Sequence, residues 1–142
     1  MIVADSSVWI NFQRLPESPD AMAFDTLLAA DEVVLVAPVL TELLRGARDE
    51  KSYRFYRDFL SALKYVEADR ETWILAGEIS HALDRRGLRV ALGDLLIATL
   101  AIQNDLPLYA LDGDFDKIHM VRSIKRYRPS EEMGREGAVT VR

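Results

Sequence analysis

Acidic side chains follow short apolar runs at two places in this sequence, at a spacing that could support metal chemistry. Asp5 comes directly after Ile2–Ala4, and Asp112 comes directly after Leu108–Leu111. Short apolar runs are typical of buried strands in a parallel sheet, whose ligands bind outside the carboxyl ends of the strands. Carboxylate oxygens are the ligands that Mg²⁺ and Mn²⁺ prefer. We therefore expect a divalent cation, Mg²⁺ or alternatively Mn²⁺, at this edge.

Three further acids could reach the same edge. Glu42 lies about one turn into a helix after the expected second strand, and Asp94 opens an apolar helix. Asp114 follows two residues after the acid at position 112. Carboxylates in one pocket raise each other's pKa unless a cation compensates their charge. A bound metal would also activate water and stabilise charge on a phosphate, which suits a chain with no Cys and only two His.

Each acid also has a structural explanation that competes with metal binding. Asp5 and Asp94 stand where helix N-caps are expected, and Asp is favoured at such caps. Glu42 could form an ion pair with Arg45, three residues further along the same helix. Asp112, with the two residues after it, could form only a turn. Taken one by one, these acids do not decide between the two interpretations.

The remaining polar and aromatic candidates favour plain structural roles. His81 is expected on an amphipathic helix and His119 in a loop, both with surface or packing roles. Trp9 and Trp73 are expected in the core. A basic ridge on one helix is expected to be a solvated face or, alternatively, a rim that contacts phosphates: Arg48, Lys51, Arg54 and Arg57.

Length and charge limit the class of protein. A chain of 142 residues has room for one domain. Its 23 acidic and 18 basic residues give a net charge of −5, which argues against nucleic-acid binding unless bound cations invert the local charge. No apolar run is long enough to span a bilayer. We therefore expect a cytoplasmic protein with no membrane contact.

Short strands alternate with helices, which predicts parallel pairing through βαβ crossovers. Strands are expected at 2–4, 33–36, 65–66 and 108–111, with an edge strand at 123–127. The pattern predicts an α/β fold, a three-layer α/β/α sandwich around a central, mainly parallel sheet of four to five short strands. The domain should cover residues 1–128, and residues 129–142 should form a mobile C-terminal tail.

Four short motifs occur in order along the chain. They are Asp5-Ser6-Ser7 before Val8-Trp9-Ile10, then Pro38 with Glu42-Leu43-Leu44 and Gly46, then Gly93-Asp94 before Leu95-Leu96-Ile97-Ala98, and finally Asp112-Gly113-Asp114-Phe115. In this order they resemble the motifs of the PIN domain, and within it of the VapC-type toxins of toxin–antitoxin pairs. The resemblance runs from Met1 to about Tyr127. It departs at Ala110, where the family often has a threonine.

The resemblance implies a metal-dependent endoribonuclease, the toxin of a toxin–antitoxin pair, that cleaves RNA by metal-activated water. The implied catalytic residues are Asp5, Glu42, Asp94 and Asp112. Asp5 and Asp94 would be the principal Mg²⁺ ligands, and the other two would bind directly or through water. A cognate antitoxin and a second copy of the chain, in a homodimer, are the implied protein partners.

Supporting roles are implied for three more side chains. Ser7 would bond to a pocket carboxylate or a substrate phosphate, and Asp114 and Arg45 would support the site or contact substrate. One alternative is a catalytically decayed PIN-like protein that acts as a binding or regulatory partner. Another is a phosphoacceptor receiver or an aspartyl phosphatase, but their acid pair or Asp-x-Asp at the first strand does not match the sequence after Asp5.

Overall fold

The chain forms a sheet of short parallel strands with helices around it. The structure is a computed structural model that describes residues 1–129. The strands are β1 (Ile2–Ala4), β2 (Val33–Val36), β3 (Lys64–Val66) and β4 (Leu108–Tyr109). The helices of the described residues are α1 (Ser6–Arg14), α2 (Pro19–Ala29), α3 (Ala37–Arg45), α4 (Glu50–Ser61), α5 (Arg70–Arg85), α6 (Leu92–Gln103) and α7 (Asp114–Val121).

The sheet has the order β3-β2-β1-β4, and every neighbouring pair is parallel. All residues of β1 and β2 are buried, as expected for strands that helices cover on both faces. The predicted α/β/α fold is therefore confirmed, with four strands among the described residues. The edge strand predicted at 123–127 does not form. Only an isolated bridge joins Arg126 to Leu108, because β4 is two residues long and offers no longer ladder.

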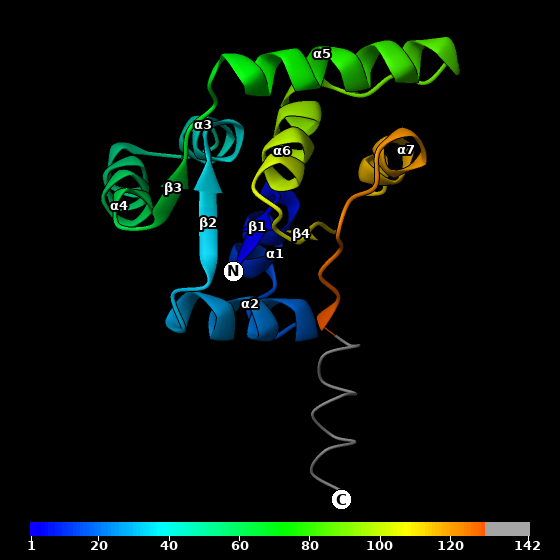
Figure 1. Ribbon diagram of the computed structural model, residues 1–142. Coiled ribbons are helices and arrows are strands. Elements are labelled where there is room, and N and C mark those ends of the chain that lie inside the picture. Colours follow the sequence, from blue (N-terminus) through cyan, green and yellow to red (C-terminus); the bar gives the residue numbers. More distant parts are fainter. Residues whose placement is uncertain (130–142) are drawn as a thin grey trace, which may run out of the picture.

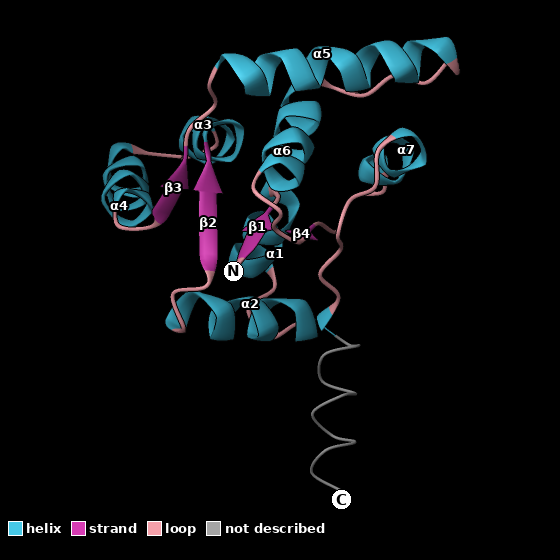
Figure 2. Cartoon of the chain, viewed as in Figure 1, coloured by secondary structure: helices cyan, strands magenta, loops and turns pink. Residues whose placement is uncertain are grey.

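Helix α6 runs against the strand direction, which brings its first turn to the carboxyl edge of the sheet. β2 points from α2 toward α5, and α6 begins on the α5 side (Figure 1). α6 packs against α5 and α3 and also contacts β1. Figure 2 shows the strands enclosed between helices. The start of α6 can therefore meet the residues that follow β1 and β4.

The aromatic core confirms one tryptophan prediction and contradicts the other. Trp9 is 2% exposed, and its ring meets Phe24 edge to face with 4.8 Å between centroids. Trp73 was predicted in the core but is 52% exposed. Thr72 is buried and lies on the same face of α5 as the buried Ala76. The next residue is turned by about 100° around the helix axis, which takes the Trp73 side chain to the surface.

Helix α7 was not predicted from the sequence. Only Phe115 and Ile118 mark its buried side, so the apolar pattern is too short to be read as a helix. His119, expected in a loop, lies in this helix, and its Nδ1 accepts a hydrogen bond from the Ile124 N–H at 3.0 Å. The predicted tail lies, apart from Pro129, outside the described residues. Within the described part of the chain, no helix combines the length and apolar character that crossing a membrane requires.

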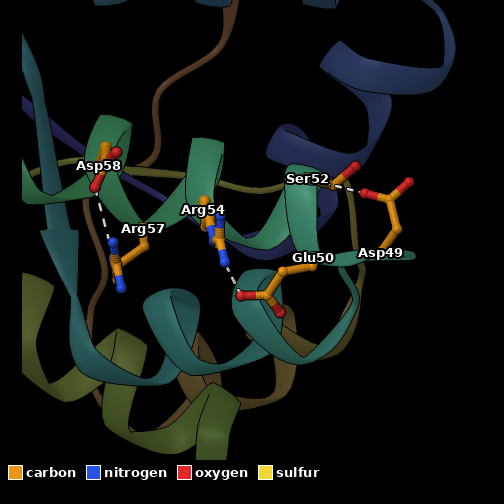
Figure 3. Close-up of polar contacts among 6 residues, drawn as sticks. All are labelled: Asp49, Glu50, Ser52, Arg54, Arg57 and Asp58. Atoms are coloured by element: carbon orange, nitrogen blue, oxygen red, sulfur yellow. Dashed lines mark hydrogen bonds and ion pairs between the residues drawn. The ribbon is translucent and has the colours of Figure 1, made fainter.

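Polar contacts on α4 explain part of the basic ridge (Figure 3). Asp49 caps this helix by accepting a hydrogen bond from the Ser52 N–H at 2.7 Å. Glu50 pairs with Arg54 at 3.2 Å, one turn further along. Arg57 lies 3.5 Å from the acid that follows it in the chain. These exposed pairs agree with the solvated-face interpretation of the ridge.

Candidate active site

Asp5 lies where β1 ends, inside the carboxyl edge of the sheet. Its backbone N–H donates to the Tyr109 carbonyl of β4 at 2.8 Å, so the ends of the two strands are adjacent. The residue is only 4% exposed. It is the N-cap of α1, and its Oδ2 accepts from the Ser7 N–H at 3.2 Å. The predicted cap role is therefore present, and it holds the carboxylate at the sheet edge.

Ser7 links this acid to the segment after β4. Its Oγ donates to Asp5 Oδ2 at 2.7 Å and accepts from the Leu111 N–H at 3.0 Å. The hydroxyl thus donates its proton to the carboxylate and accepts a hydrogen bond from the backbone of the segment that follows β4. This contact matches the expectation that Ser7 bonds to a pocket carboxylate.

Asp94, Asp112 and Asp114 form the tightest carboxylate group. One oxygen of each lies within 4.8 Å of the others. The N-cap of α6 is Ala91, so Asp94 is the third residue of the helix and the predicted cap role for it is wrong. Its carboxylate is therefore not engaged as a cap. Asp112 does form the expected turn, because its Oδ1 accepts from the Asp114 N–H at 2.9 Å.

Glu42 approaches from α3 and does not pair with Arg45. Its Oε2 accepts from Ser6 Oγ at 2.5 Å. Its Oε1 would lie only 3.2 Å from a Cβ built on Gly93. Arg45 is exposed in the last turn of α3. Among residues 1–129 its side chain makes no hydrogen bond or ion pair, so the structure does not bring it into the group of acids.

The electrostatics join the acids into one site. Burial, together with the negative charges of Asp5, Asp112, Asp114 and Glu42, raises the pKa of Asp94 from 3.8 to about 6. Burial also raises the pKa of Asp5. Hydrogen bonds from Ser7 partly offset this rise in pKa, and the negative charge of Glu42 adds to it. The five carboxylates, that of Asp94 included, therefore lie close enough together to interact electrostatically.

Positive charge is scarce near these carboxylates. Within the described residues, the only ion pair that these acids make is between Asp114 and Lys117, at 3.6 Å. Repulsion among carboxylates is relieved by protonation or by a bound cation. Oxygen ligands at this spacing suit a hard divalent ion such as Mg²⁺ or Mn²⁺. The residues present therefore fit such an ion.

The geometry differs from the sequence-based assignment in which acids are closest. Asp114, expected only in a supporting role, belongs to the tightest group, whereas Asp5 and Glu42 lie outside it. Sequence reasoning also did not single out Ser6 and Gly93, which contact or adjoin the Glu42 carboxylate. Both residues belong to motifs found in the sequence, Asp5-Ser6-Ser7 and Gly93-Asp94, but no role was assigned to either.

A cavity lined largely by apolar side chains is separate from these acids. It has a volume of about 390 Å³ and lies between α1, α2 and α4. Aromatic side chains such as Phe12, Phe55 and Phe59 line much of it. None of the five acids is among its lining residues. The acidic site lies instead at the carboxyl edge of the sheet.

Comparison with known proteins agrees with this fold. The family model described as "PIN domain" matches residues 2–119. Ribonuclease VapC11 of Mycobacterium tuberculosis is 29% identical over 129 residues, covering 88% of this chain and 96% of the relative. Ribonuclease VapC21 of the same species is 34% identical over 76 residues, covering 52% of this chain and 54% of the relative.

Solved structures share the fold. VapBC2 from Rickettsia felis, bound to a DNA fragment from its promoter, matches with a TM-score of 0.74 and 21% identity, over 89% of this chain and 98% of that chain. VapBC-1 from nontypeable Haemophilus influenzae gives a TM-score of 0.73 and 18% identity, over 92% and 99%. Because the family model covers well over half of the sequence, the chain belongs to the PIN domain family.

Proposed function

We propose that this protein is a metal-dependent endoribonuclease and the toxin of a toxin–antitoxin pair. The observation that carries the proposal is the convergence of carboxylates around Asp94 at the carboxyl edge of the sheet. The ribonuclease names of the relatives with 29% and 34% identity support RNA as the substrate class. Hydrolysis would cut a phosphodiester bond and leave a 5′-phosphate.

Some of the side chains would bind the ion, and others would hold the binding side chains in position. Asp94, Asp112 and Asp114 would supply the nearest oxygens, with Asp5 and Glu42 binding directly or through water. A bound Mg²⁺ or Mn²⁺ would lower the pKa of water and stabilise charge that develops on the phosphate. The hydrogen bonds described above would orient the carboxylates of Asp5, Glu42 and Asp112 before substrate arrives.

The acidic net charge makes the ion part of substrate binding as well. Without it, the five carboxylates would repel the RNA backbone. A divalent ion would offset two of these negative charges and present a positive centre to a phosphate oxygen. Exposed Arg45, in the last turn of the helix that carries Glu42, is a candidate to contact a phosphate beside the site.

The partners proposed here are a cognate antitoxin and a second copy of the chain. Structural neighbours described as VapBC, one of them as a member of a family of toxin–antitoxin systems, support an antitoxin. Co-expression with a cognate antitoxin should suppress RNA cleavage, and light scattering of the purified chain should give the mass of a dimer. Cleavage that is not suppressed would contradict the antitoxin proposal, and the mass of a monomer would contradict the dimer proposal.

The decisive experiment incubates the purified chain with RNA and Mg²⁺ or Mn²⁺ and sequences the new ends. Asp5→Asn and Asp94→Asn should abolish cleavage and relieve growth arrest in cells. Asp58→Asn is the matched control, because this exposed acid lies on α4 and, among residues 1–129, pairs only with Arg57. Intact RNA with the unaltered protein would refute the proposal.

A chain that has lost activity and acts only by binding would behave differently. A cation that binds only the folded state must stabilise it. A decayed site would therefore show no metal-dependent rise in melting temperature, whereas the proposed nuclease should show one.

A further inference from the structure

The Glu42 carboxylate is held where three helices meet. Ser6 of α1 donates its hydroxyl proton to Oε2 at 2.5 Å. Ser6 is only 5% exposed, so water does not compete freely for this bond. The other oxygen, Oε1, lies against Gly93 in the first turn of α6. One carboxylate therefore has a donor on one oxygen and a backbone without a side chain at the other.

The backbone conformation does not explain the glycine at position 93. Among the described glycines, only Gly87 has a positive φ. Gly93 lies in a helix, where alanine is the better helix former. A methyl group at this position would lie 3.2 Å from Oε1 of Glu42. The missing side chain is explained by the space that this oxygen needs.

We propose that Ser6 and Gly93 are positioning residues that together fix the Glu42 carboxylate beside Asp94 for metal binding. This inference rests on the proposed function and deepens it. Ser6 holds one oxygen, so the carboxylate cannot move away from a methyl group at position 93 without stretching that bond. Alternatively, the first turn of α6 must move, and Asp94 moves with it.

Supporting residues of this kind change metal affinity by about 10- to 100-fold in other sites. We expect Gly93→Ala and Ser6→Ala each to weaken Mn²⁺ binding about tenfold, at the lower end of that range, because neither removes a ligand. The affinity is measured by calorimetry on the full chain, with Mn²⁺ alone and no RNA.

Gly77→Ala is a matched control for the glycine substitution. Gly77 lies in α5, and a Cβ there would meet nothing within 4 Å. Both alanine variants gain helix propensity. Gly77→Ala should raise the metal-free melting temperature and leave the Mn²⁺ affinity unchanged. Gly93→Ala should show a smaller rise or none, together with the weaker binding.

Glu42→Ala tests whether the two residues act through this carboxylate. In the Glu42→Ala background, Gly93→Ala and Ser6→Ala should cause no further loss of Mn²⁺ affinity. A further loss of the same size, or unchanged Mn²⁺ binding in the two single variants, would overturn the inference.

Measuring RNA cleavage in parallel separates this inference from the proposed function. A chain that binds Mn²⁺ more weakly after Gly93→Ala but never cleaves RNA would refute the nuclease proposal and leave the positioning role standing. A chain that cleaves RNA and binds Mn²⁺ equally well with either residue at position 93 would refute the positioning role alone.

Discussion

Replacing Asp94 with asparagine should stabilise the metal-free protein at neutral pH. Burial, together with the charge of the nearby carboxylates, raises the pKa of this carboxyl from 3.8 to about 6. The folded protein therefore holds the proton more tightly than the unfolded chain does. The contribution of this group to stability is then most favourable below about pH 4, falls as the pH rises through about 6, and bears the full penalty above about pH 7.

The size of the penalty follows from the pKa shift. Each pKa unit corresponds to about 1.4 kcal/mol, so a rise from 3.8 to about 6 sets an upper bound of about 3 kcal/mol. Because Asp94 is partly exposed, solvent screening should reduce the effect to roughly 1–2 kcal/mol. For a chain of this size, that corresponds to a melting temperature about 3–6 °C higher in Asp94→Asn.

The assay is urea unfolding with EDTA at about pH 8 and about pH 4, where the carboxyl is ionised and protonated respectively. Asp94→Asn should gain stability only at the higher pH. The exposed control Asp58→Asn should match the unaltered protein at both. An Asp94→Asn variant that is less stable at the higher pH, or equally stabilised at both, would refute the assignment of repulsion to this site.

Three further outcomes follow from the same structure. Mg²⁺ or Mn²⁺ should raise the melting temperature strongly at about pH 8 but weakly at about pH 5, because protons compete for the carboxylates; equal shifts in thermal melts would contradict this. Tyr109→Phe should cost about 1–3 kcal/mol in urea unfolding, because it removes the buried hydroxyl that donates to Asp20 Oδ1 at 2.5 Å. Thr72→Val should cost a similar amount, about 1–3 kcal/mol, because the buried Thr72 hydroxyl donates to Gln103 at 2.6 Å and accepts from the Asp69 N–H at 3.1 Å; unchanged midpoints would contradict either expectation.

Local patterns were sufficient to predict most of the elements. The apolar runs at β1 and β2 are buried throughout, because strands covered on both faces must be apolar. The amphipathic helix that was expected around His81 is α5, and its apolar residues Ala76, Ile79 and Leu83, which recur about once per turn, are buried. Helix α7 was missed because two buried residues do not make a recognisable period. Trp73 was misplaced because size and hydrophobicity do not say on which side of a helix a residue lies.

The roles of the acids were only partly readable from local sequence. For Asp5 the cap and the pocket interpretations both hold, since the carboxylate that accepts from the Ser7 N–H also lies in the field of the other acids. The cap interpretation of Asp94 failed because α6 starts two residues earlier, at Leu92. Nothing in the local sequence excludes that earlier start.

The sequence by itself determined the types of the elements, the order of the acids and their places at element ends, because these depend on neighbours along the chain. Only the tertiary structure decided which acids meet. Ser6 reaches Glu42 across 36 positions, and Asp94 meets Asp112 and Asp114 because α6 runs back against the strands. Strand order and helix direction result from packing between distant segments, so the partners of each carboxylate are set by long-range contacts.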